Sequence, residues 1–308
     1  MRLGAISVTP IVDGQITGAP ATGFPDKSEA DWDPYRHYIV DGKLVSQTGG
    51  FLVRTGDRVV LVDAGGGPPG KVAPAGDQLG EHLTAMFRQK GLSGDQLDGA
   101  VALALTTKLD TGRLPGSLAG AGVAPEDVTD VVFTHLHSDH VGWASAHGKA
   151  YFPNATYRCS QADLDYFLGP DVDEAFSMLV WGTLSARDRL APAFGQLQTW
   201  DADSAIAPGI DVRLAPGHTP GSSVVVLSSG SERALVLGDM VHCPVELQDD
   251  EWQCIGDVDP ALAKRTREIY VRELEGGDVV GAGSHFPGLR FGRLLPAEGA
   301  RTRGWTFT

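Results

Sequence analysis

Apolar and polar positions alternate along the chain in short segments that predict strands interleaved with helices. Runs rich in β-branched residues predict strands at 3–12, 50–54, 58–62, 130–133, 155–159, 210–214, 223–227, 234–237 and 278–281. Apolar residues at three- and four-residue spacing predict helices at 78–90, 114–122, 161–167, 170–190 and 260–274. No linker-like stretch interrupts this pattern, so we expect one domain of mixed α/β class covering residues 1–308.

Two local predictions concern segments with weaker patterns. Residues 19–38 are predicted as a loop in which Phe24, Trp32 and Tyr35 stand among Gly, Pro and Asp. Aromatic residues in such a loop form either a hydrophobic anchor or the wall of a pocket, and the pattern favours neither. In a separate segment, Ser160 with the acidic Asp163 three residues later is typical of a variant capping box.

Composition and charge restrict the class of protein. The chain has 308 residues, 42% hydrophobic and 21% charged, which is ordinary for a soluble globular protein. Its net charge of −14, without any Lys/Arg-rich run, makes nucleic acid an unlikely partner. Three cysteines are too few for a disulfide framework, and we expect buried free thiols in a reducing, cytoplasmic compartment. Neither a signal peptide nor a membrane-spanning run is expected.

A histidine-rich stretch, HLHSDH at residues 135–140, follows a predicted strand at the point where the chain turns. Successive side chains of extended backbone point to opposite faces, so His135 and His137 should share one face. The following turn re-aims Asp139 and His140, which suits a second ligand point. The alternative is a histidine-rich loop without a metal, but three imidazoles and a carboxylate at this spacing favour two adjacent metal ions.

Four more candidates lie after strand-like runs. His218, Asp239 and His285 each stand where a buried strand gives way to a loop, the usual place for sites in layered α/β proteins. Asp63 ends the predicted strand 58–62 and precedes three glycines, which permit close approach of other backbone. Asp63 is therefore either a turn-capping residue or an acceptor that orients a ligand histidine.

These motifs together resemble the metallo-β-lactamase-fold superfamily. The resemblance covers residues 63–285 and rests on VDAG at 62–65, HLHSDH at 135–140, PGHTPGS at 216–222, LGD at 237–239 and GSHFP at 283–287. It implies a four-layer αββα sandwich of two mixed β-sheets, with helices outside and metals along one edge. No GxSxG nucleophile motif competes with this interpretation.

The resemblance also implies a ligand set and a chemistry. Ligands of the first metal match His135, His137 and His218; ligands of the second match Asp139, His140 and His285; Asp239 matches the bridging carboxylate and Asp63 the residue behind the ligands. Two divalent ions are implied, most simply Zn, with Mn, Co or Fe compatible with the same ligands. A metal-bridging hydroxide would then attack a carbonyl or phosphoryl centre.

Within the superfamily, the chain resembles the esterase, lactonase and organophosphate-hydrolase branch. We therefore expect hydrolysis of an ester or lactone in a small, largely apolar substrate. Phosphotriester hydrolysis is the main alternative, and β-lactamase and iron-dependent sulfur dioxygenase activities are further ones. Lactonases of this fold that quench quorum signals carry Tyr three residues after the bridging Asp, where this chain has His242. We assign catalytic roles to Asp139, Asp239 and His242.

Two features are harder to place. Aromatic residues expected either in the substrate pocket or in the core are Trp143, Phe152, Tyr166, Trp181 and Phe286. The segment 64–134 looks longer than is usual in the superfamily, and it is expected to form a lid or a contact with a second copy in a homodimer.

Overall fold

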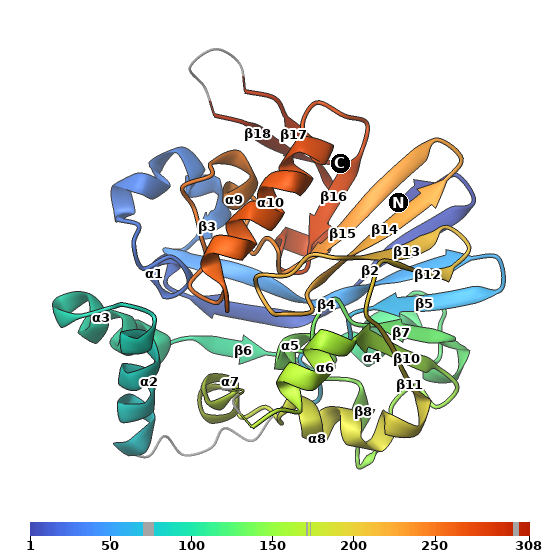
Figure 1. Ribbon diagram of the computed structural model, residues 1–308, viewed down its shortest axis with the longest axis horizontal. Coiled ribbons are helices and arrows are strands. Elements are labelled where there is room, and N and C mark those ends of the chain that lie inside the picture. The colour runs from blue at the N-terminus through green and yellow to red at the C-terminus, as the bar shows by residue number, and fades with distance from the viewer. Residues whose placement is uncertain (70–76, 171, 173, 298–301) are drawn as a thin grey trace.

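The computed structural model describes residues 1–69, 77–170, 172, 174–297 and 302–308. Two β-sheets lie face to face, and helices cover the outer face of each sheet (Figure 1). This arrangement confirms the four-layer αββα sandwich expected from the sequence motifs.

The first sheet is built mainly from the N-terminal half. Among the described residues it has nine strands in the order β1-β2-β4-β5-β7-β10-β11, with β3 paired to β4 and β6 to β2. Its strands are β1 (Arg2–Leu3), β2 (Ile6–Gly18), β3 (Ile39–Val40), β4 (Lys43–Thr55), β5 (Arg58–Val62), β6 (Lys108–Asp110), β7 (Asp130–Val132), β10 (Thr156–Ser160) and β11 (Leu197–Trp200). The sheet is mixed, because β5, β7, β10 and β11 pair in parallel and the others antiparallel.

The second sheet follows from the C-terminal half. Its seven described strands lie in sequence order, β12 (Ser204–Ala207), β13 (Ile210–Leu214), β14 (Ser223–Ser229), β15 (Glu232–Gly238), β16 (Val280–Gly283), β17 (Gly292–Leu295) and β18 (Gly304–Phe307). Only β15 and β16 pair in parallel, and α10 (Pro260–Leu274) belongs to the connection between them. A small separate hairpin joins β8 (Ser145–Ala146) and β9 (Lys149–Ala150).

Continuous apolar runs in the sequence correspond to strands buried on both faces. In β14, Val225 and Leu227 point into the core between the sheets, whereas Val224 and Val226 pack under the outer helices. Fully burying one such side chain contributes roughly 1.5–3 kcal/mol. The double burial explains why these strands lack the polar alternation of a sheet exposed to water.

Helices cover both outer faces. Those on the first sheet are α4 (Leu114–Gly120), α5 (Ser138–Val141), α6 (Gln161–Phe167), α8 (Ala186–Leu190) and the 3-10 helix η3 (Ala191–Gln196), with η2 (Pro125–Asp127) before β7. On the second sheet lie α9 (Val245–Gln248) and α10. The 3-10 helix η4 (Pro287–Leu289) precedes β17, and its Leu289 packs in the core between the sheets. In α10, Asp259 caps the N-terminus by accepting from the amide of Leu262, and Tyr270, Val271 and Leu274 face the sheet.

The long segment before β7 contains a helical hairpin. Helices α2 (Asp77–Gln89) and α3 (Gly94–Ala104) pack together around their own small core, which includes Leu83, Phe87 and Leu97. Val180 and Ile255, from elsewhere in the chain, pack against this core. The hairpin is therefore attached to the sandwich beside these two residues, rather than being part of either sheet.

The prediction of a loop at 19–38 is wrong. The segment contains α1 (Pro20–Gly23) and the 3-10 helix η1 (Glu29–Tyr38). Phe24, Trp32 and Tyr35 are buried around Trp252, with ring centroids 4.6–5.6 Å from it. A distant partner thus orders a stretch whose local pattern predicts no regular element. Trp32 and Tyr35 form an anchor, and Phe24 belongs both to this anchor and to a pocket wall.

The single helix predicted at 170–190 is also wrong, because two short helices occupy this stretch. Helix α7 (Ala175–Val180) ends before Gly182, whose φ of +68° a helix does not allow. Ser185 then caps α8 by accepting from the amide of Asp188. Residues 171 and 173 of the predicted helix lie outside the described residues.

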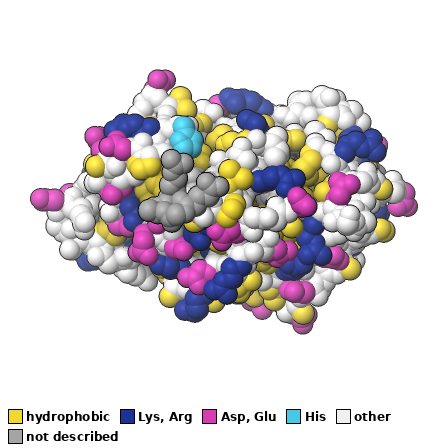
Figure 2. All heavy atoms as spheres, turned by 90° about the horizontal axis from the view of Figure 1, so that it is seen from above, with side chains coloured by type: hydrophobic (Ala, Val, Ile, Leu, Met, Phe, Trp, Pro, Cys, Tyr) yellow, Lys and Arg dark blue, Asp and Glu magenta, His cyan; other side chains and the backbone are white. Residues whose placement is uncertain are grey.

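The surface and the helix lengths bear on possible partners. On the face shown in Figure 2, Lys and Arg side chains lie interspersed with Asp and Glu. Among the described residues, no helix has the length and apolar character needed to cross a membrane.

Candidate metal centre

The predicted ligand residues come together at one edge of the sandwich from loops that follow strands of both sheets. Residues 135–140 follow β7, His218 lies between β13 and β14, Asp239 follows β15 and His285 follows β16. Each strand end fixes where its loop begins, so residues far apart in sequence reach one point.

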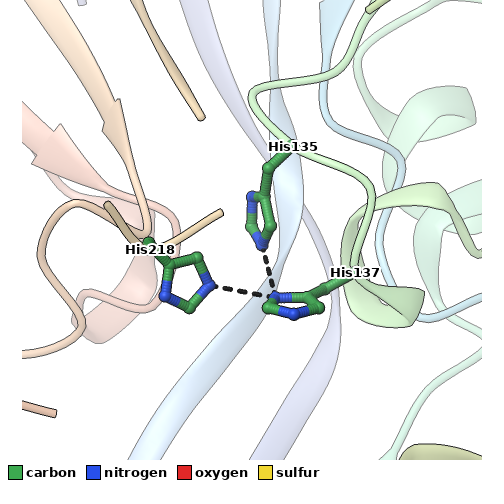
Figure 3. Close-up of side chains that lie close together, drawn as sticks. All are labelled: His135, His137 and His218. Atoms are coloured by element: carbon green, nitrogen blue, oxygen red, sulfur yellow. Dashed lines mark hydrogen bonds between the residues drawn. The ribbon is translucent and has the colours of Figure 1, made fainter. Parts of the chain in front are cut away.

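Three histidines form the first cluster. The Nδ1 atom of His137 lies 2.9 Å from Nε2 of His135 and 2.9 Å from Nε2 of His218 (Figure 3). One proton cannot satisfy three nitrogens that face one another. Burial holds the pKa of both His135 and His137 well below the ordinary value, so their imidazoles are neutral. Neutral imidazoles with converging lone pairs are suited to a metal cation.

A second cluster lies beside the first. Ligand atoms of Asp139, His140 and His285 all lie within 4.8 Å of one another. Asp239 stands between the two clusters: its Oδ2 is 2.9 Å from Nε2 of His285 and 3.7 Å from Nε2 of His218. Its Oδ1 is 3.4 Å from Nε2 of His140. A carboxylate in this position can contact cations in both clusters.

Asp63 holds the His140 ring from behind. Its Oδ2 accepts from Nδ1 of His140 at 2.9 Å and from the Ser284 hydroxyl at 3.1 Å. Thr134 donates its amide to Oδ1 and its hydroxyl to Oδ2, at 2.8 and 2.9 Å. When the ring of His140 is neutral with its proton on Nδ1, the lone pair of Nε2 faces the cluster. Asp63 adopts a φ of +61°, a strained conformation that is common at functional sites.

Two further histidines are held in the same way. Nδ1 of His285 donates to the carbonyl oxygen of Gln47 at 2.8 Å, and Nδ1 of His218 donates to Oδ1 of Asp257 at 3.1 Å. With the ring neutral, each contact places the proton on Nδ1 and directs the lone pair of Nε2 at the clusters. The sequence motifs pointed to neither Gln47 nor Asp257 as a partner of a ligand histidine.

The charges on the buried aspartate and histidine side chains of the two clusters favour the binding of cations. Burial raises the pKa of Asp239, but the surrounding histidines, His285 first, outweigh it and hold this pKa well below the ordinary value. Burial lowers the pKa of His140, yet Asp239 and Asp63 raise it well above the ordinary value. Nε2 of His140 and Oδ1 of Asp239 are buried without a hydrogen-bond partner among the described residues. A carboxylate that keeps its charge within a buried group of imidazole nitrogens fits two divalent cations.

Asp163 joins two of the ligand loops, and the predicted capping box is wrong. The carboxylate is fully buried and accepts from the amides of Leu136 and Gly221 and from the hydroxyl of Thr219. Burial raises the pKa of Asp163 to about 6. The Ser160 side chain makes no capping hydrogen bond. Asp163 is thus turned inward, where it fixes the loop before His137 to the loop after His218.

A cavity of about 320 Å³ opens at the two clusters. At one end it is lined by His137, Asp139, His218, Asp239, His242 and His285. Elsewhere its lining is mainly apolar and includes Ile16, Phe24, Leu44, Met86, Phe87, Trp181 and Ile255. Residues of α2, of the loop between α1 and η1, and of the first sheet therefore surround one cavity that leads to the histidines.

A family model described as the metallo-beta-lactamase superfamily matches residues 46–282 of this sequence. The chain belongs to the metallo-β-lactamase superfamily. The matched range includes six of the seven predicted ligands, and His285 follows it by three residues.

Similar proteins extend the comparison. The human metallo-beta-lactamase domain-containing protein 1 is 34% identical over 193 residues, which are 62% of this chain and 59% of that protein. An N-acyl homoserine lactonase of Bacillus cereus is 22% identical, over 72% of this chain and 76% of the lactonase. The solved structure of AidC, a dizinc quorum-quenching lactonase, superposes with a TM-score of 0.76 at 21% identity, covering 99% of this chain and 95% of AidC. The likeness to AidC shows that this chain has the same fold as AidC.

The predicted pocket aromatics divide into core and lining. Phe152 and Phe286 are fully buried, and Trp143 donates its indole N–H to Asp13 inside the protein, so the pocket prediction is wrong for these three. Tyr166 packs partly buried against the core beside Phe167, outside the cavity lining. Among the five predicted aromatics, Trp181 lines the cavity.

Several lining residues had no signal in the sequence. Met86 belongs to a helical stripe that the pattern assigns to a core, and it lies on both the hairpin core and the cavity. Cys254, expected to be buried, is only partly buried and also lines the cavity, while Cys159 and Cys243 are buried as expected. Such side chains become visible as lining only after distant segments are brought together.

Proposed function

We propose that this protein is a dinuclear metal-dependent hydrolase that cleaves an ester or lactone bond in a small, largely apolar molecule. The observation that carries the proposal is the meeting of seven candidate ligand side chains at one end of a mainly apolar cavity. Kinship with a lactonase sequence and the fold of a dizinc lactonase support this choice of reaction.

Each side chain has a role in this proposal. The residues proposed to hold one cation are His135, His137 and His218; those for the other are Asp139, His140 and His285; Asp239 would contact both. When bound, two divalent ions, most simply zinc, lower the pKa of water and stabilise negative charge that develops on oxygen. Asp63 and Asp257 accept from Nδ1 of His140 and His218, so Nε2 of each ring would be the atom that binds a cation.

His242 is proposed to face the substrate. Its Nε2 lies 3.5 Å from Oδ2 of Asp239, and the side chain is 14% exposed and lines the cavity. In hydrolysis, water adds to the carbonyl carbon, the acyl C–O bond breaks and a proton from water ends on the leaving oxygen. An imidazole at this place can hydrogen-bond that oxygen.

The cavity lining supports an apolar, uncharged substrate. Lys90, at its edge, donates to the carbonyl of Ile255 at 2.6 Å, and Glu174 accepts from the amide of Ala186 at 2.8 Å. Both charged groups thus already have protein partners. The mixed charges on the face in Figure 2 likewise fit a small molecule better than a nucleic acid.

A hydrolysis panel on the metal-assayed protein tests the proposal. The panel contains aryl esters, γ- and δ-lactones, a phosphotriester and a cephalosporin, each measured before and after chelation and after zinc is added back. We expect ester or lactone turnover that is lost on chelation and restored by zinc. Turnover of the phosphotriester alone would favour the alternative hydrolase, and full activity in chelated, metal-free protein would refute the metal-dependent mechanism.

Replacing Met86 with alanine should weaken selection for long apolar chains. Met86 lines the cavity, and each lost methylene contact in an apolar pocket is worth about 0.8 kcal/mol. The ratio of kcat/KM for octanoyl over acetyl esters should therefore fall about tenfold, while acetyl turnover stays unchanged. Arg88→Ala, an exposed change on the same helix, is the control. An unchanged ratio in Met86→Ala would place the acyl chain elsewhere.

A further inference from the structure

A short loop of residues 254–258 lies between the helical hairpin and the metal centre. It begins at Cys254, which lines the cavity, and it contacts both neighbours through different atoms. Gly256 lies beside the His218 ring: a Cβ built there would make an ordinary van der Waals contact, 3.5 Å from Cε1 of His218. The 254–258 loop is therefore a neighbour of His218 as well as of the hairpin.

On the metal side, the 254–258 loop holds His218 at two points, and Asp259, directly after the loop, holds the neighbouring Gly217. Asp257, 4% exposed, places Oδ1 3.1 Å from Nδ1 of the imidazole. The amide of Val258 donates to the His218 carbonyl at 3.0 Å, and the amide of Asp259 donates to the Gly217 carbonyl at 2.9 Å. These contacts fix both the backbone that carries His218 and the tautomer of its ring.

On the other side, the same loop is held by the hairpin. Nζ of Lys90, directly after α2, donates to the Ile255 carbonyl at 2.6 Å and lies 3.5 Å from the Asp257 carbonyl. The Ile255 side chain packs against the hairpin core, whose members include Leu83 and Phe87. An ammonium donor to carbonyl oxygens makes a charge-assisted bond, roughly twice as strong as a neutral one.

We propose that Asp257 is a positioning residue for His218, and that the α2–α3 hairpin supports it by holding the 254–258 loop through Lys90. The inference rests on the proposed function, because it assigns His218 to the three-histidine cation site. It gives the helical hairpin a second task beyond forming the cavity wall: retention of the cation held by His135, His137 and His218 depends on a lysine outside the ligand set.

Zinc competition tests this proposal without a substrate. Wild-type protein and the variants Asp257→Ala, Asp257→Asn, Lys90→Met and Lys90→Arg are loaded with zinc and titrated with a chromophoric chelator. Loss of a partner behind a ligand histidine typically weakens metal binding by about 10–100-fold. We expect a loss of that size in Asp257→Ala for one of two zinc ions, with a smaller loss in Asp257→Asn, which keeps an acceptor oxygen.

Lys90→Met should lower the affinity for the same zinc ion by roughly tenfold, toward the lower end of that range. Lys90→Arg should restore this affinity. Arg88→Met, an exposed change two residues earlier, serves as the matched control. The Tm of each metal-free variant is measured in parallel, because a purely structural role for Lys90 would lower Tm without changing the zinc affinity.

The outcomes separate the two proposals. Wild-type protein that binds no zinc would contradict the proposed function itself. A second result would overturn the positioning role. In this result, wild-type protein binds two zinc ions, and Asp257→Ala either leaves both affinities unchanged or lowers both equally. Unchanged affinity in Lys90→Met, with the expected loss in Asp257→Ala, would remove the hairpin from the proposal.

Discussion

Replacing Asp239 with alanine should lower hydrolysis by about 10³-fold or more, because one carboxylate serves both halves of the proposed centre. Its two oxygens lie 2.9–3.7 Å from the facing nitrogens of His140, His218 and His285. Without it, a buried group of imidazoles loses a carboxylate that lies within 4 Å of all three. We expect the zinc content to fall from two ions toward one or none, measured by elemental analysis beside kcat/KM.

Asp239→Asn separates charge from shape. The amide keeps one oxygen and the same volume, so zinc retention should lie between wild type and alanine, with turnover still strongly reduced. Asp98→Ala, on the exposed side of α3, is the control and should leave both quantities unchanged. Full turnover in Asp239→Ala would show that the seven residues are not a hydrolytic centre.

The meeting of the candidate ligand residues could be predicted from the sequence because the pattern that marks most of them is local. HLHSDH at 135–140 combines ligand types, a strand end and a turn within six positions, and the structure brings these residues together with His218 and His285. Strand ends place such residues at a common edge whatever the rest of the chain does. The layered fold is predictable for a related reason: β14 and β15 are apolar on both faces and must be covered on both.

The cavity wall could not be predicted in this way, because it depends on packing between distant segments. Met86, Phe24 and Ile255 are about 60–230 positions apart yet line one space. Trp143 and Phe286 look like pocket aromatics from their neighbours in sequence, but both are held inside the protein by partners that no local pattern reveals. Asp257 lies 39 positions from His218, so no local motif predicts their contact, for the same reason.

Asp13 shows how a small irregularity redirects a side chain. The predicted strand 3–12 stops one residue short of it, whereas β2 continues to Gly18 with a register shift between Val12 and Gly14. Such a bulge turns the carboxylate inward, where it is fully buried. In the sequence alone, a polar residue after an apolar run predicts the end of a strand. In the fold, this residue anchors two loops.

Replacing Asp13 with alanine should therefore lower the free energy of unfolding by about 4 kcal/mol. Its carboxylate accepts five hydrogen bonds of 2.9–3.2 Å, given by the amides of Gly66, Gly67, Gly112 and Leu114 and by the indole of Trp143. Each buried donor left without an acceptor costs about 1–3 kcal/mol, partly relieved by water that enters. Thermal unfolding should show a Tm lower by roughly 10 °C.

The comparison of two variants decides whether hydrogen bonding is the cause. Asp13→Asn keeps the volume but presents an NH₂ group to N–H donors, so it should lose nearly as much stability as alanine, which a simple cavity effect would not produce. Asp57→Ala, exposed in the β4–β5 turn, should leave Tm unchanged. Because Gly67 packs against the backbone of Gly142, two residues after His140, the loosened loops should also weaken zinc binding. A stable Asp13→Asn would mean that the five donors do not need a carboxylate.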